Sequence, residues 1–301
     1  MQRVVTSSYF TLLSKCAGIL LICLTAMPCA ADEPAPEFFR VKLLLSDHEA
    51  ILKDGIAYKV IITNTSRSSI MISGPLLDPP FRCFTQVKAP GKEWQRVQDF
   101  STILAPHTPG LIQIPAGGIW AEYGQLCMTA DKDVIFSTIG KWEIRAQVRT
   151  VLGTVVSEAC PLEIKDWPKG VLLGPDFSRG GNLVLRWERA PRRLDLEKFA
   201  KGSEHYRFGS IGKTLKMVIA AETYISTGEI SGKEVSRQEA YKLLAAPLDE
   251  VRKDQLAKML INDAMQKERW KDASDLLREL KELSYFRRGR EAEAEAYLGK
   301  P

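Results

Sequence analysis

The chain has 301 residues, of which 45% are hydrophobic and 26% are charged. This composition suits a globular protein of two modest domains and excludes a chain that is disordered throughout. The formal net charge is only +5, from 42 basic and 37 acidic residues that are interspersed along the chain. A nucleic-acid-binding protein usually concentrates its basic residues in a patch or stripe, so we expect no nucleic-acid partner.

The N-terminal residues have the parts of a secretory signal. Arg3 and Lys15 precede an uncharged stretch, 16–31, which ends in small residues and is followed by an acidic, proline-rich run. Its apolar centre is about a dozen residues long, whereas a membrane-spanning helix needs about 20. We therefore predict a signal peptide at 1–31, a linker at 32–37, and export to the periplasm or beyond the cell.

Cleavage after Ala31 places Cys29 and Ala31 at the two small-residue positions of a cleavage site. Two alternatives stay open. The segment 4–13 is also fairly apolar, so an uncleaved signal would anchor the protein in the membrane, and lipid attachment at Cys29 or Cys23 is the other alternative. In either case the membrane would be contacted only through this segment.

Removal of the signal leaves three cysteines, Cys83, Cys127 and Cys160. An odd number allows at most one intramolecular disulfide, and an oxidising compartment would preserve one. Our preferred pair is Cys83 with Cys127, and buried free thiols are the alternative. The three histidines are scattered and no Cys-x-x-Cys occurs, so we expect no metal site.

Short alternating segments occupy residues 38–165. Tyr58, Val60 and Ile62 alternate with more polar neighbours such as Lys59, a period of two that predicts a strand with one buried face. Glycine- and proline-rich turns separate the segments, which is typical of an antiparallel β-sandwich. The predicted strands are 39–45, 57–64, 70–72, 82–87, 94–97, 111–114, 121–128, 141–149 and 155–164.

Three of these runs resemble the immunoglobulin-like domains of exported bacterial proteins. The run 57–66 resembles their opening strand followed by Asn-x-Ser, and 136–146 resembles their penultimate strand, Phe-x-x-x-Gly-x-Trp-x-Ile-Arg-Ala. The strand 155–164 completes the pattern. The resemblance implies an immunoglobulin-like sandwich that binds a partner or serves as a spacer. It implies no catalytic residues, since a fold does not by itself give a function.

Residues 166–200 have the composition of an irregular connector, and helical spacing follows it. Ser236 with Glu239 is a capping-box signature for a helix at 237–246, which Pro247 ends. The other predicted helices are 211–226, 254–267, 270–283 and a short one at 291–296. We therefore expect a multidomain protein, strands first and then an α-helical domain at 201–301.

The helices 254–267 and 270–283 form a hairpin that resembles a tetratricopeptide repeat. Its small and large packing positions match Leu260, Ala264, Ala273 and Leu277, while the aromatic and glycine usual in the first helix are replaced by Ala257 and Ile261. Arrays of such hairpins need about three repeats to bury a continuous core. The helices are therefore expected to pack against the sandwich or the connector.

No motif indicates an active site. The run 209–214 lacks the first glycine of a phosphate-binding loop, because Arg207 stands at that position. His48, between Asp47 and Glu49, fits a solvated turn better than a metal site, and His205 fits the start of a helix. We predict no catalytic, cofactor-binding or metal-binding residues. Trp120 follows a Gly-Gly turn and is a candidate for ligand contact, with burial as its alternative.

The sequence thus predicts a non-enzymatic, exported binding or scaffold protein of the cell envelope. Its helical hairpins would offer a groove to a protein or peptide partner, and a glycan is the second kind of partner. The alternatives are an extracytoplasmic enzyme, a protease inhibitor that presents the loop 73–80, a carbohydrate-binding accessory module and a structural envelope component.

Overall fold

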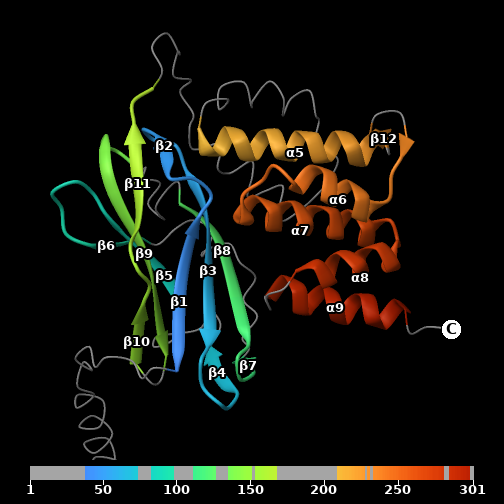
Figure 1. Ribbon diagram of the computed structural model, residues 1–301, viewed down its shortest axis with the longest axis horizontal. Helices are drawn as coiled ribbons and strands as arrows, with labels where there is room; N and C mark the ends of the chain where they lie inside the picture. Colours follow the sequence, from blue (N-terminus) through green and yellow to red (C-terminus); the bar gives the residue numbers. More distant parts are fainter. Residues whose placement is uncertain are drawn as a thin grey trace, which may run out of the picture. The chain divides into compact units, whose positions relative to one another are not determined.

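The computed structural model describes residues 38–73, 83–97, 111–126, 135–150, 153–167, 209–227, 229–230, 233–280 and 285–298. They belong to one compact unit, Ala35–Pro301. Strands come first and helices follow, as the sequence predicts (Figure 1). The predicted signal peptide, the linker 32–37, Cys127, His205 and nearly all of the connector lie outside the described residues.

The described strands between residues 38 and 167 form two larger sheets and a separate antiparallel pair. One sheet has three strands in the order β1-β3-β8, and the other has the order β2-β11-β9-β5-β6 with β10 beside β9, while β4 pairs with β7. The bounds are β1 Phe39–Leu45, β2 Glu49–Ile51, β3 Ile56–Asn64, β4 Ile70–Ser73, β5 Cys83–Lys88, β6 Gln95–Val97, β7 Leu111–Ile114, β8 Ile119–Leu126, β9 Gly140–Thr150, β10 Gly153–Val156 and β11 Cys160–Lys165.

Most of the strand pairs are antiparallel, but β2 pairs in parallel with β11. The larger sheet is therefore mixed, and the prediction of a purely antiparallel β region was wrong on this point. The predicted strand 155–164 is in fact two strands, β10 and β11, separated by residues 157–159. The Ser157 hydroxyl accepts from the Ala146 backbone N–H at 2.9 Å, so the break still satisfies a buried donor of β9.

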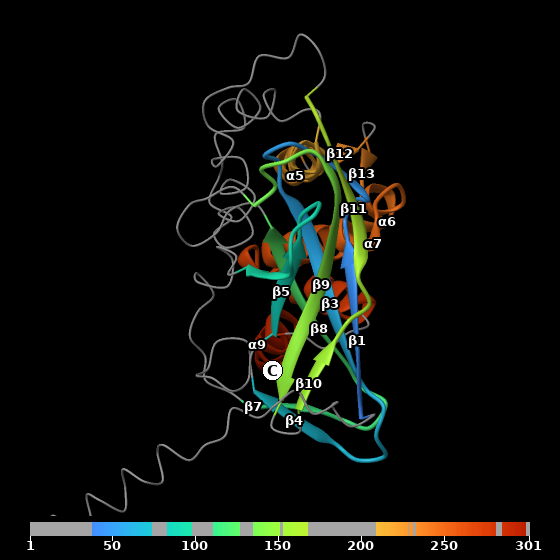
Figure 2. The ribbon, with the colours of Figure 1, turned by 90° about the vertical axis from the view of Figure 1, so that its left-hand side faces the viewer.

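The two larger sheets share one hydrophobic core, because the inward residues of both belong to the same buried cluster. Along β9 the alternation is that of the sequence: Trp142, Ile144 and Ala146 are buried, while Lys141 is exposed. The Phe136 and Trp142 rings meet edge to face with their centroids 5.3 Å apart, a favoured aromatic geometry. Figure 2 shows β9 running beside β10 and β11.

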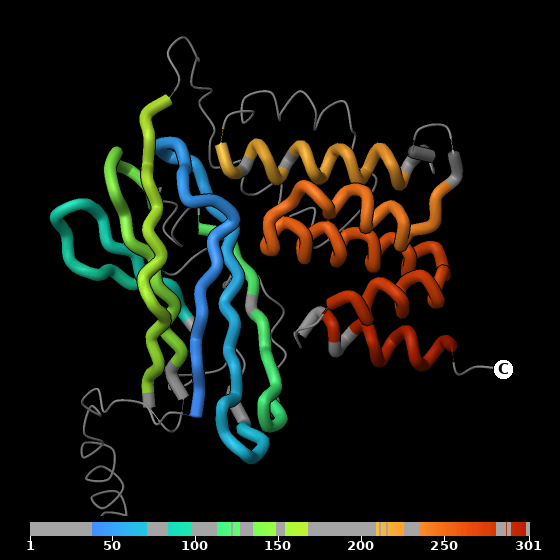
Figure 3. Tube along the Cα trace, viewed as in Figure 1, coloured from blue at the N-terminus to red at the C-terminus, as the bar shows by residue number. Residues whose placement is uncertain are grey.

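The helices are α5 Ser210–Thr227, α6 Arg237–Ala245, α7 Glu250–Gln266, α8 Trp270–Glu279 and α9 Tyr285–Leu298, with the short pair β12 Glu229–Ile230 and β13 Lys233–Glu234 after α5 (Figure 3). The predicted capping box at Ser236 and Glu239 is confirmed, with both reciprocal hydrogen bonds formed. Helix α7 begins earlier than predicted because the Asp249 side chain caps it, accepting from the Arg252 backbone N–H at 2.9 Å.

A second core lies among the helices. Leu260 and Ala264 of α7 and Ala273 and Leu277 of α8 are all buried in it, so the periodicity that predicts this hairpin marks its inner face. None of the described helices is both long enough and apolar enough to cross a membrane.

Helix α5 begins against the β region, and a carboxylate of the β2–β3 turn caps it. Asp54, which is 3% exposed, accepts from the Ser210 backbone N–H at 2.7 Å with one oxygen and from the Gly55 N–H at 2.8 Å with the other. An anionic acceptor at a helix N-terminus satisfies an orphan donor and complements the helix dipole. The close approach requires a glycine at 209, since a Cβ there would lie 1.8 Å from Asp54 Oδ2.

A second junction buries a lysine of β3. Lys59 is 2% exposed, and its ammonium donates to Asp254 Oδ2 of α7 at 2.7 Å. The same oxygen accepts from the Tyr123 hydroxyl of β8 at 2.8 Å. The sequence places Lys59 on the polar face of its strand, but α7 packs on that face. Both faces of β3 are therefore largely buried.

Candidate functional site

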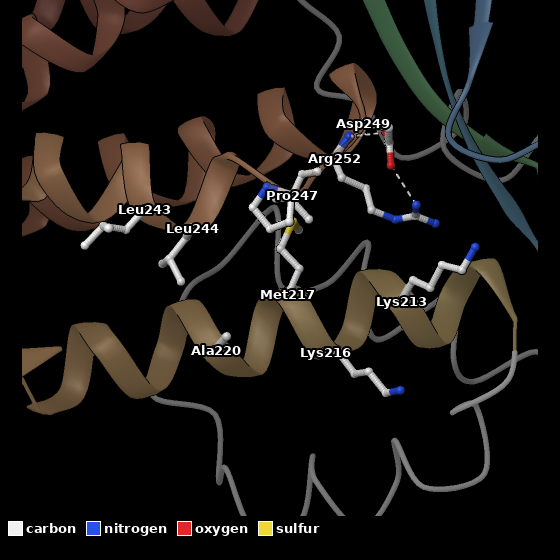
Figure 4. Close-up of a pocket in the computed structure, with 10 residues that line it drawn as sticks. Lys213, Lys216, Met217, Ala220, Leu243, Leu244, Pro247, Asp249 and Arg252 are labelled. Atoms are coloured by element: carbon white, nitrogen blue, oxygen red, sulfur yellow. Dashed lines mark hydrogen bonds and ion pairs between the residues drawn. The ribbon is translucent and has the colours of Figure 1, made fainter. Parts of the chain in front are cut away.

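A groove of about 430 Å³ lies between α5 and the end of α6 with the turn that follows it. This volume is in the range of small-molecule and side-chain binding sites. Figure 4 shows Met217 of α5 rising toward Pro247, with Leu243 and Leu244 above α5. The lining residues are Lys213, Lys216, Met217, Ala220, Leu243, Leu244, Pro247, Leu248, Asp249 and Arg252.

One face of α5 forms one side of the groove. Lys213, Lys216, Met217 and Ala220 recur at the three- and four-residue spacing that places side chains along one helix face. Met217 is 7% exposed, whereas Ala220 is exposed. The small Ala220 side chain leaves the space above it open, so this part of the helix can receive a side chain from another molecule.

The other side of the groove comes from the end of α6 and its exit turn. Pro247 cannot continue the helix because it lacks a backbone N–H, and the Leu248 N–H turns back to the Ala245 carbonyl at 2.9 Å. Leu243 is 57% exposed. A leucine left this open beside an apolar groove is available for a partner to cover.

Arg252 closes the polar end of the groove, and all three of its guanidinium nitrogens donate hydrogen bonds within the protein. Its guanidinium donates to Asp249 Oδ2 at 2.7 Å, to Thr214 Oγ1 at 3.0 Å and to the Ser210 hydroxyl at 2.9 Å. It also pairs with Asp47 of the β region. Because Arg252 is only 4% exposed, it holds the groove together and is not a group that a ligand would reach.

Asp47 joins the β region to two cations of this polar end, Arg252 and Lys213. Burial would raise the pKa of the Asp47 carboxyl, but hydrogen bonds from Arg252, Lys213 and Ser210 outweigh burial and hold the pKa below its ordinary value of 3.8. The carboxylate is therefore ionised at neutral pH, and it neutralises part of the positive charge beside it.

The remaining charge at the groove belongs to Lys216. It extends outward from α5 at the rim (Figure 4), and it is exposed. Within the described part of the chain, no side chain forms an ion pair with it. The groove thus combines an apolar floor with one cationic rim, which suits a ligand that has an apolar body and a negative charge at its edge.

The groove residues include no cysteine, serine, threonine or histidine that could act as a nucleophile beside a base. Among the described residues, no group of three or more His, Cys, Asp or Glu side chains is arranged to hold a metal ion. Asp47 and Glu49 turn to different partners, since Glu49 pairs with Lys165 at 2.7 Å while Asp47 binds Arg252. The carboxylates on either side of His48 therefore do not converge.

The residues singled out from the sequence lie elsewhere. Trp120 is 0% exposed in the core of the β region, and a buried ring offers no face to a ligand. Cys83 begins β5, and since Cys127 lies outside the described residues, their pairing stays a prediction. Cys160 is a free cysteine whose Sγ lies 3.2 Å from the Leu43 carbonyl oxygen. Burial, with nearby Glu158, raises the pKa of its thiol.

The sequence analysis did not predict the groove, although the sequence of one of its two sides contains an unusual feature. The predicted helix 211–226 carries Lys213, Lys216 and Ala220 on the face of Met217, which is unusually polar for a face that packs. The other side of the groove depends on how α6 meets α5, and periodicity along one helix contains no information about that.

No protein-family model matches the chain, and no curated protein matches it. Solved structures align over parts of it. They include a β-glucosidase of Erythrobacter marinus (TM-score 0.27, 9% identity, 42% of this chain and 15% of that one) and the alkylpurine DNA glycosylase AlkC of Pseudomonas fluorescens (0.29, 10%, 47% and 33%). The sporulation control protein Spo0M of Bacillus subtilis also aligns (0.27, 11%, 50% and 54%).

The chain spans less than two thirds of each of these three proteins. TM-scores this low do not define a shared fold, so these proteins indicate no activity for this chain.

Proposed function

We propose that the protein is a non-enzymatic, exported binding protein of the cell envelope, and that its groove takes a segment of a partner protein. The segment would be amphipathic, with apolar side chains for the groove and a carboxylate for Lys216. In this proposal the β region is an immunoglobulin-like sandwich and the helices are tetratricopeptide-like hairpins. The secretory pattern at 1–31 supports export.

The observation that carries the proposal is the apolar groove with an open leucine and a cationic rim. Leu243 is 57% exposed beside the buried Met217, so a partner that covers it removes apolar surface from water. Complete burial of one leucine-sized side chain is worth about 1.5–3 kcal/mol. Two or three such contacts would give specific binding in the mode in which an amphipathic helix occupies a groove.

Charge complementarity selects the kind of segment. Lys216 favours a glutamate or aspartate beside the apolar residues, because an opposite charge at the rim of an interface steers association and fixes register. A lysine-flanked segment would meet Lys216 with a like charge and would be disfavoured. The occupant is therefore an acidic amphipathic peptide and not a basic one.

A peptide titration with the exported chain tests this proposal. The probe is a labelled helical peptide with leucines at helical spacing and flanking glutamates, and its counterpart has lysines in place of the glutamates. We expect saturable binding of the glutamate peptide by fluorescence anisotropy, at least about tenfold tighter than binding of its counterpart, which corresponds to 1.4 kcal/mol.

The variants Ala220→Trp, which fills the groove, and Lys216→Glu, which reverses the rim charge, should each weaken binding by about tenfold or more. The matched controls are Ala292→Trp and Lys271→Glu, at exposed positions of α9 and α8. Absence of saturable binding, or equal losses in the controls, would overturn the proposal.

A further inference from the structure

The outer face of the larger sheet has a row of polar side chains across three strands. Gln86 of β5 stands opposite Arg96 of β6 on one side and opposite Arg145 of β9 on the other. Their strand neighbours Val87, Ile144 and Val97 point into the core. Because side chains alternate along a strand, the three polar residues share the face turned away from the core.

Two of these residues are arginines whose guanidinium groups lie over aromatic rings. The Arg145 guanidinium carbon is 4.1 Å from the centroid of the Trp94 ring, and that of Arg96 is 4.0 Å from the centroid of the Phe84 ring. Stacking on a ring holds the planar guanidinium in one orientation. Less side-chain freedom then remains to be lost when an anion binds.

Arg145 keeps hydrogen-bonding capacity that no residue in the described part of the chain uses. Its Nε donates to Gln86 Oε1 at 2.7 Å, which orients the guanidinium further. No described residue accepts a hydrogen bond from its two terminal nitrogens. These nitrogens form the fork that binds a carboxylate or a sulfate with two parallel hydrogen bonds.

The surrounding charge is positive. Lys88 lies 5.8 Å from the Trp94 ring centroid, and its contact with Glu143 is long, 3.4 Å, between side chains that are 38% and 47% exposed. Lys141 follows on β9 in the same alternation as Arg145. On β11 the position opposite Lys141 is Glu163, where the cationic area ends. Across β6, β5 and β9 the four cations Arg96, Lys88, Arg145 and Lys141 thus share this face with the carboxylate of Glu143, and Glu163 lies at the margin on β11.

We propose that this face, which we call the arginine row (Arg96, Gln86, Arg145 with Trp94 and Lys88), binds an acidic polysaccharide. The fork of Arg145 would bind one carboxylate or sulfate group, while Arg96, Lys88 and Lys141 add positive charge around it. A polysaccharide with an acidic group on successive sugars would place further negative charges beside these cations.

The covered rings favour a glycan over a single-stranded nucleic acid. Proteins that bind single strands without sequence preference stack bases on open aromatic faces. Here Arg145 and Lys88 approach Trp94, and Arg96 covers Phe84. What the surface presents is the fork of Arg145 among other cations, which favours acidic groups over the flat faces of bases.

Affinity electrophoresis of the exported chain tests the arginine row. The probes are polygalacturonate, whose acids are carboxylates, and dextran sulfate, with neutral dextran as the control polymer. Single-stranded DNA and anionic lipid vesicles are the competing polyanions. We expect retardation by at least one acidic polysaccharide, none by neutral dextran, and weaker binding of DNA and vesicles at equal charge.

The double variant Arg96→Gln with Arg145→Gln should lose at least about tenfold in affinity, or 1.4 kcal/mol. Arg145→Lys keeps the charge but loses the fork, so it should fall between the native protein and the double variant. The matched control, Arg278→Gln with Lys271→Gln, removes two charges from exposed positions of α8.

Thermal melting of each variant shows that it is folded before binding is compared. An equal loss in the control variant would show that binding follows net charge alone, and DNA or vesicles bound as tightly as the polysaccharides would show a general polyanion surface. Either result, or no retardation by any acidic polysaccharide, would overturn the proposal.

Discussion

Replacement of Gly209 by alanine perturbs the junction between α5 and the β region at one side chain, Asp54. The new Cβ would lie 1.8 Å from Asp54 Oδ2, far inside van der Waals contact, and Asp54 is buried, so the carboxylate must move. The movement breaks its hydrogen bond from the Ser210 N–H, now 2.7 Å long. A hydrogen bond to a charged group contributes about 1.5–3 kcal/mol, and the helix dipole adds about 0.3–1 kcal/mol.

Against this loss, alanine reduces the freedom of the unfolded chain, which favours folding by about 0.4–1 kcal/mol. The expected decrease in the free energy of unfolding for Gly209→Ala is therefore about 1–3 kcal/mol. Urea denaturation followed by circular dichroism measures it through the midpoint, provided that the slope with denaturant is unchanged.

The double variant Asp54→Ala with Gly209→Ala tests whether contact with Asp54 causes this loss. In the Asp54→Ala background the oxygen that would clash is absent, so Gly209→Ala should cost almost nothing there or should stabilise slightly. The double-mutant cycle should then show a coupling of more than about 1 kcal/mol, as expected for residues in contact. If Gly209→Ala has the same cost in both backgrounds, the close approach to Asp54 is not the reason for a glycine at this position.

Three further predictions concern buried ionisable groups, each measured by denaturation. Lys59→Met leaves the buried Asp254 without its cation and should lower the free energy of unfolding by about 3–5 kcal/mol. The double variant Lys59→Met with Asp254→Leu removes both charges and should recover much of this loss. No recovery would contradict the role of the ion pair. The pKa of Asp47 is lowered on folding, so its contribution to stability is present above its ordinary pKa of 3.8 and is lost as the pH falls below that value. The stability of Asp47→Asn should therefore decrease less in acid than that of the native protein. Burial, then the charges of Asp254 and Glu279, raises the pKa of Tyr241 to about 12, so stability should fall as the pH rises from 10 toward 12, and Tyr241→Phe should remove that part of the alkaline loss.

Local patterns predicted much of the secondary structure. The period of two across 57–64 and 141–149 and the capping box at Ser236 each depend on residues within a few positions, and the structure has β3, β9 and α6 there. The three-residue strand β2 was not predicted. It is too short to show a period, and its partner β11 lies more than a hundred residues further along the chain.

Partners that are distant in sequence account for the other differences. Lys59 looks like a solvent-facing residue because its strand alternates, yet Asp254 and Tyr123 enclose it. Asp47 looks like part of a solvated turn, yet it pairs with Arg252, 205 positions away. In both cases a helix that follows much later in the sequence supplies the partner, which the local pattern does not show. The groove has the same origin, since it exists only where α5 meets the end of α6.

A photo-crosslinking residue at position 220, in the open part of the groove, gives the most direct test of the proposed function. The matched control carries it at position 292, an exposed alanine of α9. After irradiation of cells that produce the protein, the crosslinked partner peptide is identified by mass spectrometry. We predict a recurrent crosslink from position 220 alone, to a segment with apolar residues at helical spacing beside glutamate or aspartate. Equal crosslinking from both positions, or a segment that is basic or lacks apolar residues, would contradict the proposal.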